Sequence, residues 1–595
     1  MPEKKKKRKS VKRKPAKRKP SILAGQWVSM LLISILSLLL YANTFQNKFV
    51  WDDSVFILDN ESIKNPQGIA QFFTSPSSFS AKGDLFIYRP LAALSFALDW
   101  RLWKLKTFPY HILNLLFYTL CGIMLYMVMQ RLSRNNITAL FVALIFIAHP
   151  VHTESVTWIA ARSDGMFLLF LLLSLLFYMK YISAPVPKKT PYFILSLIWY
   201  ALSLLSKETA IVLPLLLVLC DFYSAARHRV RKTLYNAKYY VWFVLVAVAY
   251  LYLRYSVFGR WGGKEDIRIG ENIFSGVFTM SRVAAHYIRL LFFPVGQSAI
   301  YMVRISSSIK DVRVIVSLLL ITVFVLTSIL LARKSRETSF CILWFFVALL
   351  PVLNIIPMQN VIMAERFLFL PSIGFCMFLG TRLSLLIKSR RKQLKKSALF
   401  LFFSILVFYS LKTMARNRDW KDDFTFWKQA SVTAPSSDRV HTNLGLIYDS
   451  RLELARAIEE YKKSLELNPD NAEVYFRLGI DYDKAGWYEL AMKMFLEALK
   501  KDPLNGSIHS ALGSIYARTG LYENAFRQAN QALKLKGDDA SAYNTLGLVY
   551  ERRGNYSLAI SYYRRALELS GEGTEARTNY NRAYRMLNRR RMTVY

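Results

Sequence analysis

The sequence predicts an all-α protein, in which a polytopic transmembrane bundle of about eleven helices is followed by a solenoid of short helical repeats. Two observations predict this class. Of the 595 residues, 53% are hydrophobic, and they cluster in apolar runs of about 20 residues. Each such run can cross about 30 Å of hydrocarbon as a helix. The carboxyl-terminal part instead repeats one residue pattern at a fixed interval of 34. A chain of this length divides into at least two folded units.

A basic segment, residues 1–21, precedes the first apolar run. Twelve of the first 20 residues are Lys or Arg and one is acidic. The formal net charge of +40 is compatible with nucleic-acid or anionic-lipid contact, but a basic segment beside a span is typical of a cytoplasmic terminus. We therefore interpret 1–21 as a disordered cytoplasmic tail and expect no nucleic-acid partner. The apolar run is too long, and lacks a small-residue cleavage site, for a removed signal peptide.

The membrane domain is predicted to cover residues 22–414. Its spans are expected at 22–42, 111–131, 137–149, 164–183, 191–206, 208–223, 239–257, 312–332, 339–356, 366–387 and 397–414. With the amino terminus inside, every second loop should be basic. The loops that obey this rule are 131–136, 183–191, 223–238 (which includes Arg227), 333–338 and 388–396. The opposite loop, 43–110, balances seven basic residues against six acids.

The segment 275–294 is apolar but carries Arg282, His286 and Arg289 on one helical stripe. We interpret it as interfacial or re-entrant rather than as a span. An odd count of eleven spans then places everything after Met414 on the extracytoplasmic side. All four cysteines lie in apolar stretches, so neither a disulfide framework nor a thiolate metal site is expected. They are Cys121, Cys220, Cys341 and Cys376.

Three residue types recur at intervals of 34 in the tail. The series are Gly445, Gly479, Gly513 and Gly547; Tyr448, Tyr482, Tyr516 and Tyr550; and Ala457, Ala491, Ala525 and Ala559. This period and pattern indicate four tetratricopeptide helix–turn–helix repeats. The glycine permits close helix approach, and the tyrosine is expected to fill the groove beside it. Pro469 and Pro503 mark turns between units, and Gly537 and Gly571 mark the later turns.

The repeat domain is predicted over 437–595, with a linker helix over 415–436 and a capping helix from about 574 to 590. A stack of such repeats forms a concave surface suited to extended peptides or partner helices. The alternative interpretation is a structural spacer, because repeats alone name no ligand.

Charged residues gather at the predicted extracytoplasmic ends of the spans, where their cost indicates function. The acidic pair Asp52 and Asp53 could accept a proton from an attacking hydroxyl, and a solvated loop or a helix cap is the alternative. Cations at three span ends could bind the phosphate of a lipid-linked donor, or could merely close the span ends as ion pairs or turns. These cations are Arg162, Lys207 and Arg366. The supporting residues are Arg89, His149, His152, Glu154, Asp164, Glu208 and Glu365.

His149, His152 and Glu154 also suggest a metal site. Pro150 interrupts any helix there and no further ligand is evident, so packing and hydrogen bonding at a span end is the favoured interpretation. We expect no metal.

The ordered motifs resemble those of the transmembrane and tetratricopeptide repeat-containing family of O-mannosyltransferases. The resembling stretches are Trp51-Asp52-Asp53-Ser54, Tyr88-Arg89-Pro90-Leu91, His149-Pro150-Val151-His152-Thr153-Glu154, Ser206-Lys207-Glu208, Ala364-Glu365-Arg366-Phe367-Leu368-Phe369-Leu370-Pro371-Ser372-Ile373-Gly374 and Arg416-Asn417-Arg418-Asp419-Trp420. Together they cover most of the chain after the basic tail.

The resemblance implies a GT-C glycosyltransferase fold, a polyprenyl-phosphate sugar as donor, and an active-site acidic pair that falls on Asp52 and Asp53. It also implies that no cofactor, nucleotide sugar or metal is needed. This chain departs from many animal members in having four repeats and in having Thr209, rather than glutamine, after Glu208. The basic tail and compact length are closer to bacterial or archaeal members. We expect a plasma membrane with the repeats outside the cytoplasm, or alternatively an endoplasmic reticulum membrane with lumenal repeats.

The sequence therefore predicts a membrane glycosyltransferase that moves a sugar, mannose by resemblance, from a polyprenyl-phosphate donor to Ser or Thr of a protein held by the repeats. Asp52 would be the base and Asp53 would orient it or the acceptor. Two alternatives stay open. One is a non-catalytic scaffold for an envelope complex, and the other is a polysaccharide polymerase or ligase, which would be expected to use arginine-rich loops and a lipid-diphosphate donor.

Overall fold

The computed structural model describes residues 22–81, 86–224, 229–260, 272–353, 361–570 and 575–592, and within these ranges it contains helices and no strands. The predicted basic tail 1–21, together with Arg227 and Gly571, lies outside the described residues. The chain divides into two units. The first comprises 1–299 and 303–422, and the second comprises 300–302 and 423–595. The all-α class predicted from the sequence is confirmed.

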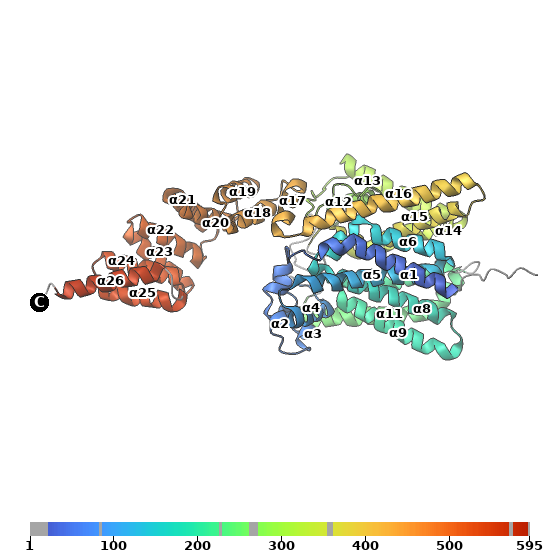
Figure 1. Ribbon diagram of the computed structural model, residues 1–595, viewed down its shortest axis with the longest axis horizontal. Coiled ribbons are helices and arrows are strands. Elements are labelled where there is room, and N and C mark those ends of the chain that lie inside the picture. Colours follow the sequence, from blue (N-terminus) through green and yellow to red (C-terminus); the bar gives the residue numbers. More distant parts are fainter. Residues whose placement is uncertain are drawn as a thin grey trace, which may run out of the picture. The chain divides into compact units, whose positions relative to one another are not determined.

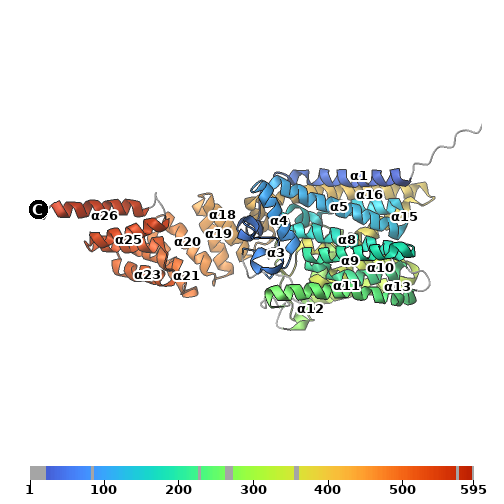
Figure 2. The ribbon, with the colours of Figure 1, turned by 90° about the horizontal axis from the view of Figure 1, so that it is seen from below.

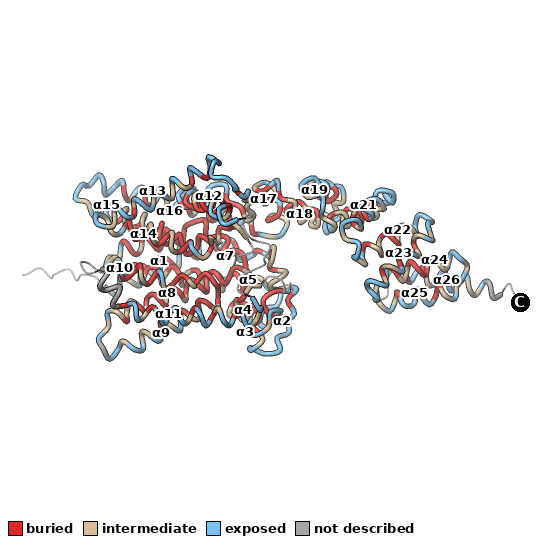
Figure 3. The backbone as a smooth tube through the Cα atoms, turned by 180° about the vertical axis from the view of Figure 1, so that it is seen from behind, coloured by how far each residue is buried: buried red, intermediate tan, exposed pale blue. Residues whose placement is uncertain are grey.

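The first unit is a bundle of long apolar helices that run side by side (Figures 1 and 2). Its main helices are α1 (Ile22–Tyr41), α5 (Thr107–Ser133), α6 (Asn136–Ala148), α8 (Arg162–Ser183), α9 (Lys189–Ser206), α10 (Leu213–Ser224), α11 (Arg229–Phe258), α12 (Ile273–Phe292), α13 (Val312–Lys334), α14 (Arg336–Leu349), α15 (Ser372–Ile387) and α16 (Lys392–Asn417). Buried residues concentrate in the interior, along α8 among others (Figure 3). Nearly every residue of α6 is buried, as expected for a helix that is apolar on all sides.

Six helices among the described residues are long and apolar enough to cross a membrane, and up to seven if one bent pair counts as a span. The six match the predicted spans at 22–42, 111–131, 164–183, 239–257, 312–332 and 397–414. The bent pair joins α6 to a short segment at 150–157, at an angle of 55°. The remaining predicted spans coincide with shorter helices, such as α14 and α15, so the count of eleven stays a prediction.

The predicted loop 43–110 folds into short helices at the end of the bundle where α1 finishes (Figures 1 and 2). They are α2 (Glu61–Lys64), α3 (Gln71–Thr74) and α4 (Pro90–Trp103). Pro90 occupies the first position of α4. Proline has no backbone N–H, but an N–H at this position would have no partner within the helix, so the helix loses no hydrogen bond. The segment predicted as interfacial, 275–294, forms α12, whose Arg282 donates to Ser306 Oγ at 2.5 Å. This helix is not among the six candidate spans.

The second unit begins with α17 (Asp423–Thr433) and continues as paired antiparallel helices. The pairs are α18 (Asp438–Ser450) with α19 (Leu454–Leu467), α20 (Ala472–Lys484) with α21 (Tyr488–Lys501), α22 (Gly506–Arg518) with α23 (Tyr522–Leu535), and α24 (Ala540–Arg552) with α25 (Tyr556–Ser570), followed by α26 (Glu575–Met592). The linker predicted as one helix over 415–436 is instead divided between the end of α16, a short turn at Arg418–Trp420 and α17.

The repeated glycines lie where two helices of a repeat approach most closely. A Cβ atom on Gly445 would lie 2.5 Å from the ring of Tyr461, and one on Gly547 would lie 2.5 Å from Tyr563. The predicted close approach is therefore present. The ring that meets each of these two glycines comes from the second helix of its repeat, a contact that was not predicted.

Candidate functional site

The chain enters the candidate site through a strained turn at Trp51. Its φ of 58° is the left-handed region, which bulky residues rarely adopt. The indole ring of Trp51 stacks on that of Trp158, with centroids 4.7 Å apart, and lies 6.2 Å from the ring of Trp420. Trp51 and Trp420 belong to the sequence motifs, Trp158 does not, and the contact among the three was not predicted. The aromatic packing holds a turn that would otherwise be costly.

The two carboxylates of the acidic pair have different surroundings. Asp53 is 1% exposed, and its Oδ2 and Oδ1 accept hydrogen bonds from the backbone N–H groups of Val50 at 2.9 Å and Ala160 at 2.8 Å. This carboxylate therefore ties the turn to the segment before α8. The side chain of Asp52 is only half-buried, so it is the member of the pair that a substrate can reach.

Three ion pairs form a charged layer next to this turn, each joining distant parts of the chain. The guanidinium of Arg89 makes a two-pronged contact with Glu208, at 2.7 Å and 3.1 Å. Lys207 pairs with Asp164, and Arg366 pairs with Glu154 while its backbone N–H donates to the same carboxylate at 3.1 Å. We call these six residues the charged layer. Each was among the residues singled out from the sequence.

The three pairs are neighbours. The ring of Phe367 lies 6.0 Å from Lys207 Nζ and 5.3 Å from the Arg366 guanidinium. Burial lowers the pKa of Lys207, and the positive charges of Arg89 and Arg366 act in the same direction. The cations differ in accessibility, because 20% of the Arg89 side chain and 14% of the Arg366 side chain are exposed, against 2% for Lys207. Arg89 and Arg366 can therefore reach a ligand while Lys207 adds charge behind them.

Arg162 lies in a different environment from the other predicted phosphate-binding residues. It is fully buried, pairs with Asp99 at 2.6 Å and donates to Asn114 Oδ1 at 2.8 Å. Burial raises the pKa of Asp99 even though the charge of Arg162 opposes it. Asp99 was missed in the sequence, although an acid within the apolar run that follows Pro90 is a usable signal. The predicted phosphate-binding role of Arg162 stays a prediction, since this geometry engages its donors within the protein.

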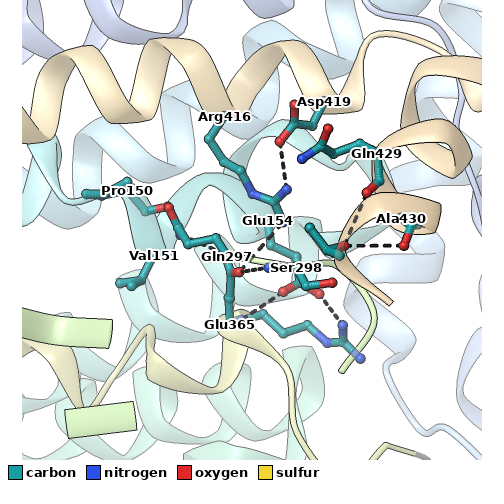
Figure 4. A network of polar contacts seen from close by, with 12 residues as sticks. Pro150, Val151, Glu154, Gln297, Ser298, Glu365, Arg416, Asp419, Gln429 and Ala430 are labelled. Carbon is teal, nitrogen blue, oxygen red and sulfur yellow. Dashed lines mark hydrogen bonds and ion pairs between the residues drawn. The ribbon is translucent and has the colours of Figure 1, made fainter. Parts of the chain in front are cut away.

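Glu365 belongs to a buried network that lies beside Glu154 of the charged layer (Figure 4). Its carboxylate accepts from Gln297 Nε2 and from the backbone N–H of Ser298, each at 2.8 Å. Arg416 lies 3.6 Å from the same carboxylate and 2.7 Å from Asp419. Gln297 also donates to the carbonyl of Pro150 at 3.1 Å. Glu365 thus fixes the segment that carries Arg366 against α16 and the turn at Pro150, a role that the sequence did not reveal.

The two histidines point to different partners. His149 Nε2 lies 3.0 Å from the carbonyl oxygen of Leu291, and His152 Nε2 lies 2.8 Å from Ser372 Oγ. Within the described ranges no group of three or more His, Cys, Asp or Glu side chains is placed to hold a metal ion. Both histidines therefore link helix ends, and whether the protein uses a metal stays a prediction.

Comparisons with known proteins bear on the repeats and on the predicted family resemblance. Models described as tetratricopeptide repeats match residues 453–486, 472–503 and 504–572. The crystal structure of MamA protein matches 26% of this chain and 86% of that chain, at 25% identity and a TM-score of 0.24.

Curated relatives match a much larger part of the chain. A protein O-mannosyl-transferase of Caenorhabditis elegans is 25% identical over 456 residues, which cover 74% of this chain and 63% of that protein. Protein O-mannosyl-transferase tmtc2 of Xenopus laevis is 23% identical and covers 74% and 62%. Human protein O-mannosyl-transferase TMTC3 is 22% identical and covers 72% and 50%. The predicted resemblance to the TMTC-like family is confirmed. The chain spans half to just under two thirds of the length of these relatives.

Proposed function

We propose that this TMTC-like membrane protein transfers mannose from a polyprenyl-phosphate donor to Ser or Thr of a polypeptide. The observation that carries the proposal is the position of Asp52, a half-buried carboxylate on a strained turn beside the charged layer, whose three cations are each paired with an acid. A glycosyl transfer from a phosphate needs a base for the hydroxyl and positive charge for the departing phosphate. The names of the curated relatives support the same reaction class.

The chemistry follows from these roles. The acceptor hydroxyl attacks the anomeric carbon of the sugar, forming a new carbon–oxygen bond while the bond from that carbon to the phosphate oxygen breaks. The hydroxyl proton passes to Asp52, and the polyprenyl phosphate leaves with the bonding electrons. Asp53 acts as a positioning residue, because its oxygens already accept two backbone hydrogen bonds.

Arg89 and Arg366 are the proposed ligands of the donor phosphate, since both remain partly exposed. A guanidinium can bind two phosphate oxygens at once, which suits a group whose charge grows during the reaction. Lys207 strengthens the positive potential from behind. With three side-chain cations available, we propose that neither a metal ion nor a nucleotide sugar takes part. We also propose that the charged layer and the repeats lie on the extracytoplasmic side of the membrane, the repeats presenting the acceptor.

The proposal is tested in membranes that contain the full-length protein, a labelled polyprenyl-phosphate mannose and Ser/Thr peptides. Asp52→Asn keeps the shape of the side chain and removes the base, so transfer should fall at least 100-fold. Asp59→Asn, an exposed acid of the same loop, is the matched control and should leave transfer unchanged. EDTA should have no effect. Full transfer by Asp52→Asn would refute the role of Asp52, and labelled polysaccharide in place of labelled peptide would favour a polymerase or ligase.

A further inference from the structure

Ion pairs join successive repeats along the first helices of the solenoid. Asp449 of α18 pairs with Lys484 of α20 at 2.5 Å, and Asp483 of α20 pairs with Arg518 of α22 at 2.7 Å. In both cases the base lies 35 residues after the acid. Within the 34-residue unit, the acid occupies one position and the base occupies the position directly after it. Each acid pairs with the base of the following unit. We call this series the repeat ladder.

The repeat ladder is interrupted at its third step. The register places Ala517 where the earlier repeats have Asp449 and Asp483, and it places Arg552 where they have Lys484 and Arg518. Ala517 is buried and uncharged. Arg552 is exposed, and it forms no ion pair, hydrogen bond or cation–π contact with any part of the chain that the structure describes.

The next acid does not compensate for the missing one. Glu551, one residue before Arg552, accepts two hydrogen bonds from Arg582 of α26, at 2.7 Å and 3.0 Å. The following step of the ladder is thus completed by the last helix. Arg552 is the ladder cation that the fold leaves without an acid.

A row of aliphatic side chains runs beside the ladder. Leu446 and Ile480 lie three residues before Asp449 and Asp483, and Leu548 lies at the same position of the fourth repeat; all three are partly buried. The third repeat has Ser514 at this position. Residues three and four apart share one helix face, so the cations and the aliphatic row lie on the same face of the first helices. An extended polypeptide needs such a surface, with apolar contacts for its side chains and a few charges that fix its register.

We propose that a carboxylate side chain of a bound polypeptide completes the third step of the repeat ladder by pairing with Arg552. The intact steps use Asp at this position, so the site matches Asp or Glu of the partner. The polypeptide would be the acceptor of the proposed transfer, and to that extent the inference rests on the proposed function. Binding is nevertheless measured separately from transfer.

The test uses the full-length protein in detergent micelles and two matched pools of extended, fluorescent Ser/Thr peptides. One pool carries a single Glu and the other an isosteric Gln at the same position. Fluorescence anisotropy should show that the wild-type protein binds the Glu pool about 3- to 5-fold more tightly, as expected for a partly exposed ion pair. This preference should decline as salt is raised.

Two variants should abolish the preference by different means. Arg552→Gln removes the cation, and Ala517→Asp supplies an internal acid that occupies it. Arg564→Gln, an exposed arginine on the second helix of the same repeat, is the matched control and should keep the preference. Because Ala517 is buried, an aspartate there could destabilise the repeat, so Ala517→Asp is first checked for wild-type thermal unfolding. Arg552 is exposed, so Arg552→Gln tests the proposal without a risk to folding.

Equal binding of the two pools by the wild-type protein, or a preference that survives Arg552→Gln, would overturn the inference. The variant Asp52→Asn should keep the full preference for the Glu pool even when it transfers no sugar. A protein that prefers Glu peptides but lacks transferase activity would therefore refute the proposed function and leave this inference standing.

Discussion

Trp51 stacks on Trp158 with ring centroids 4.7 Å apart, and the guanidinium of Arg366 lies 5.5 Å from the ring of Trp158. The turn that carries the proposed base therefore touches the proposed phosphate site through one indole ring. The left-handed φ of Trp51 costs of order 1–3 kcal/mol, and such strain persists only where the surroundings hold it. Trp158 is the residue best placed to hold it.

Replacing Trp158 by alanine should release the turn and move Asp52 away from the acceptor. We expect the turnover rate for transfer to fall at least 10-fold, because misplacement by about 1 Å is costly for catalysis. The KM for the donor should rise as well, because Trp158 also contacts Arg366. Trp158→Phe keeps an aromatic face and should recover most of the rate. The readout is the kcat and KM of each variant with labelled donor. Alanine and phenylalanine variants that lose activity equally would indicate that the stack only stabilises the fold.

The sequence predicted that the members of the charged layer would meet, although Glu154 and Arg366 are 212 residues apart. It could do so because most of these charged residues lie near the end of an apolar run, and span ends on the same side of a membrane share one level; Arg89, within the predicted loop 43–110, is the exception. It assigned the base to Asp52 and the orienting role to Asp53, but it gave no sign that their surroundings differ. That difference depends on the backbone N–H of Ala160, which lies 107 residues away and leaves no signal in side-chain identity.

In the repeats, too, some contacts could be predicted from the sequence and others could not. The period of 34 predicted the paired helices and the close helix approach at Gly445, because units of equal length stack in a regular way. The residue that meets Gly445 was not predicted, because the equivalents of Tyr461 at intervals of 34 are Phe495, Ala529 and Tyr563 and form no uniform series. The pairing of Arg162 with Asp99 was likewise not predicted, because it depends on how α4 lies against the start of α8.

Substitutions of Arg162 and Asp99 distinguish an effect on folding stability from an effect on binding of the donor. Arg162→Met alone leaves a buried carboxylate without its partner and should cost about 3–5 kcal/mol of folding stability. The double variant Arg162→Met with Asp99→Leu removes both charges and should recover most of that loss. Thermal unfolding in detergent measures both effects. If the double variant is stable but its donor KM rises at least 10-fold, Arg162 contacts the donor phosphate as the sequence suggested.

The glycines of the repeats should differ in their tolerance of alanine. A Cβ on Gly479 would lie 2.6 Å from the ring of Phe495, whereas the atoms nearest to a Cβ on Gly513 are two backbone atoms and the Cβ of Gln528, at 3.3–3.5 Å. Gly479→Ala should therefore destabilise its repeat by about 1–3 kcal/mol. Gly513→Ala should be close to neutral, because the gain in helix propensity offsets the tighter contact. Hydrogen exchange of α20 and α22 in the full-length protein measures each effect locally. Equal protection in the two variants would contradict the prediction.

The carboxylates of Asp449 and Asp481 share Lys484, at 2.5 Å and 3.4 Å. Burial is the main cause that raises the pKa of Asp481 to about 6, and the neighbouring charge of Asp449 adds to it. A carboxyl whose pKa is higher in the folded than in the unfolded chain binds its proton more tightly when folded. Its contribution to stability is therefore fully present below about pH 4 and is lost as the pH rises through about 6.

Asp481→Asn removes this loss and should protect α20 against hydrogen exchange at neutral pH by about 1–2 kcal/mol relative to the wild-type protein. The advantage should vanish near pH 4, where the wild-type carboxyl is protonated and the two side chains are nearly isosteric. Asp470→Asn is the control, because Asp470 is 82% exposed and pairs with Lys501 at the surface, so its effect should stay below about 1 kcal/mol. A variant that is less protected than the wild-type protein at neutral pH would mean that the pairing of Asp481 with Lys484 outweighs its repulsion from Asp449, and would reverse the sign of the pH dependence assigned to this repeat.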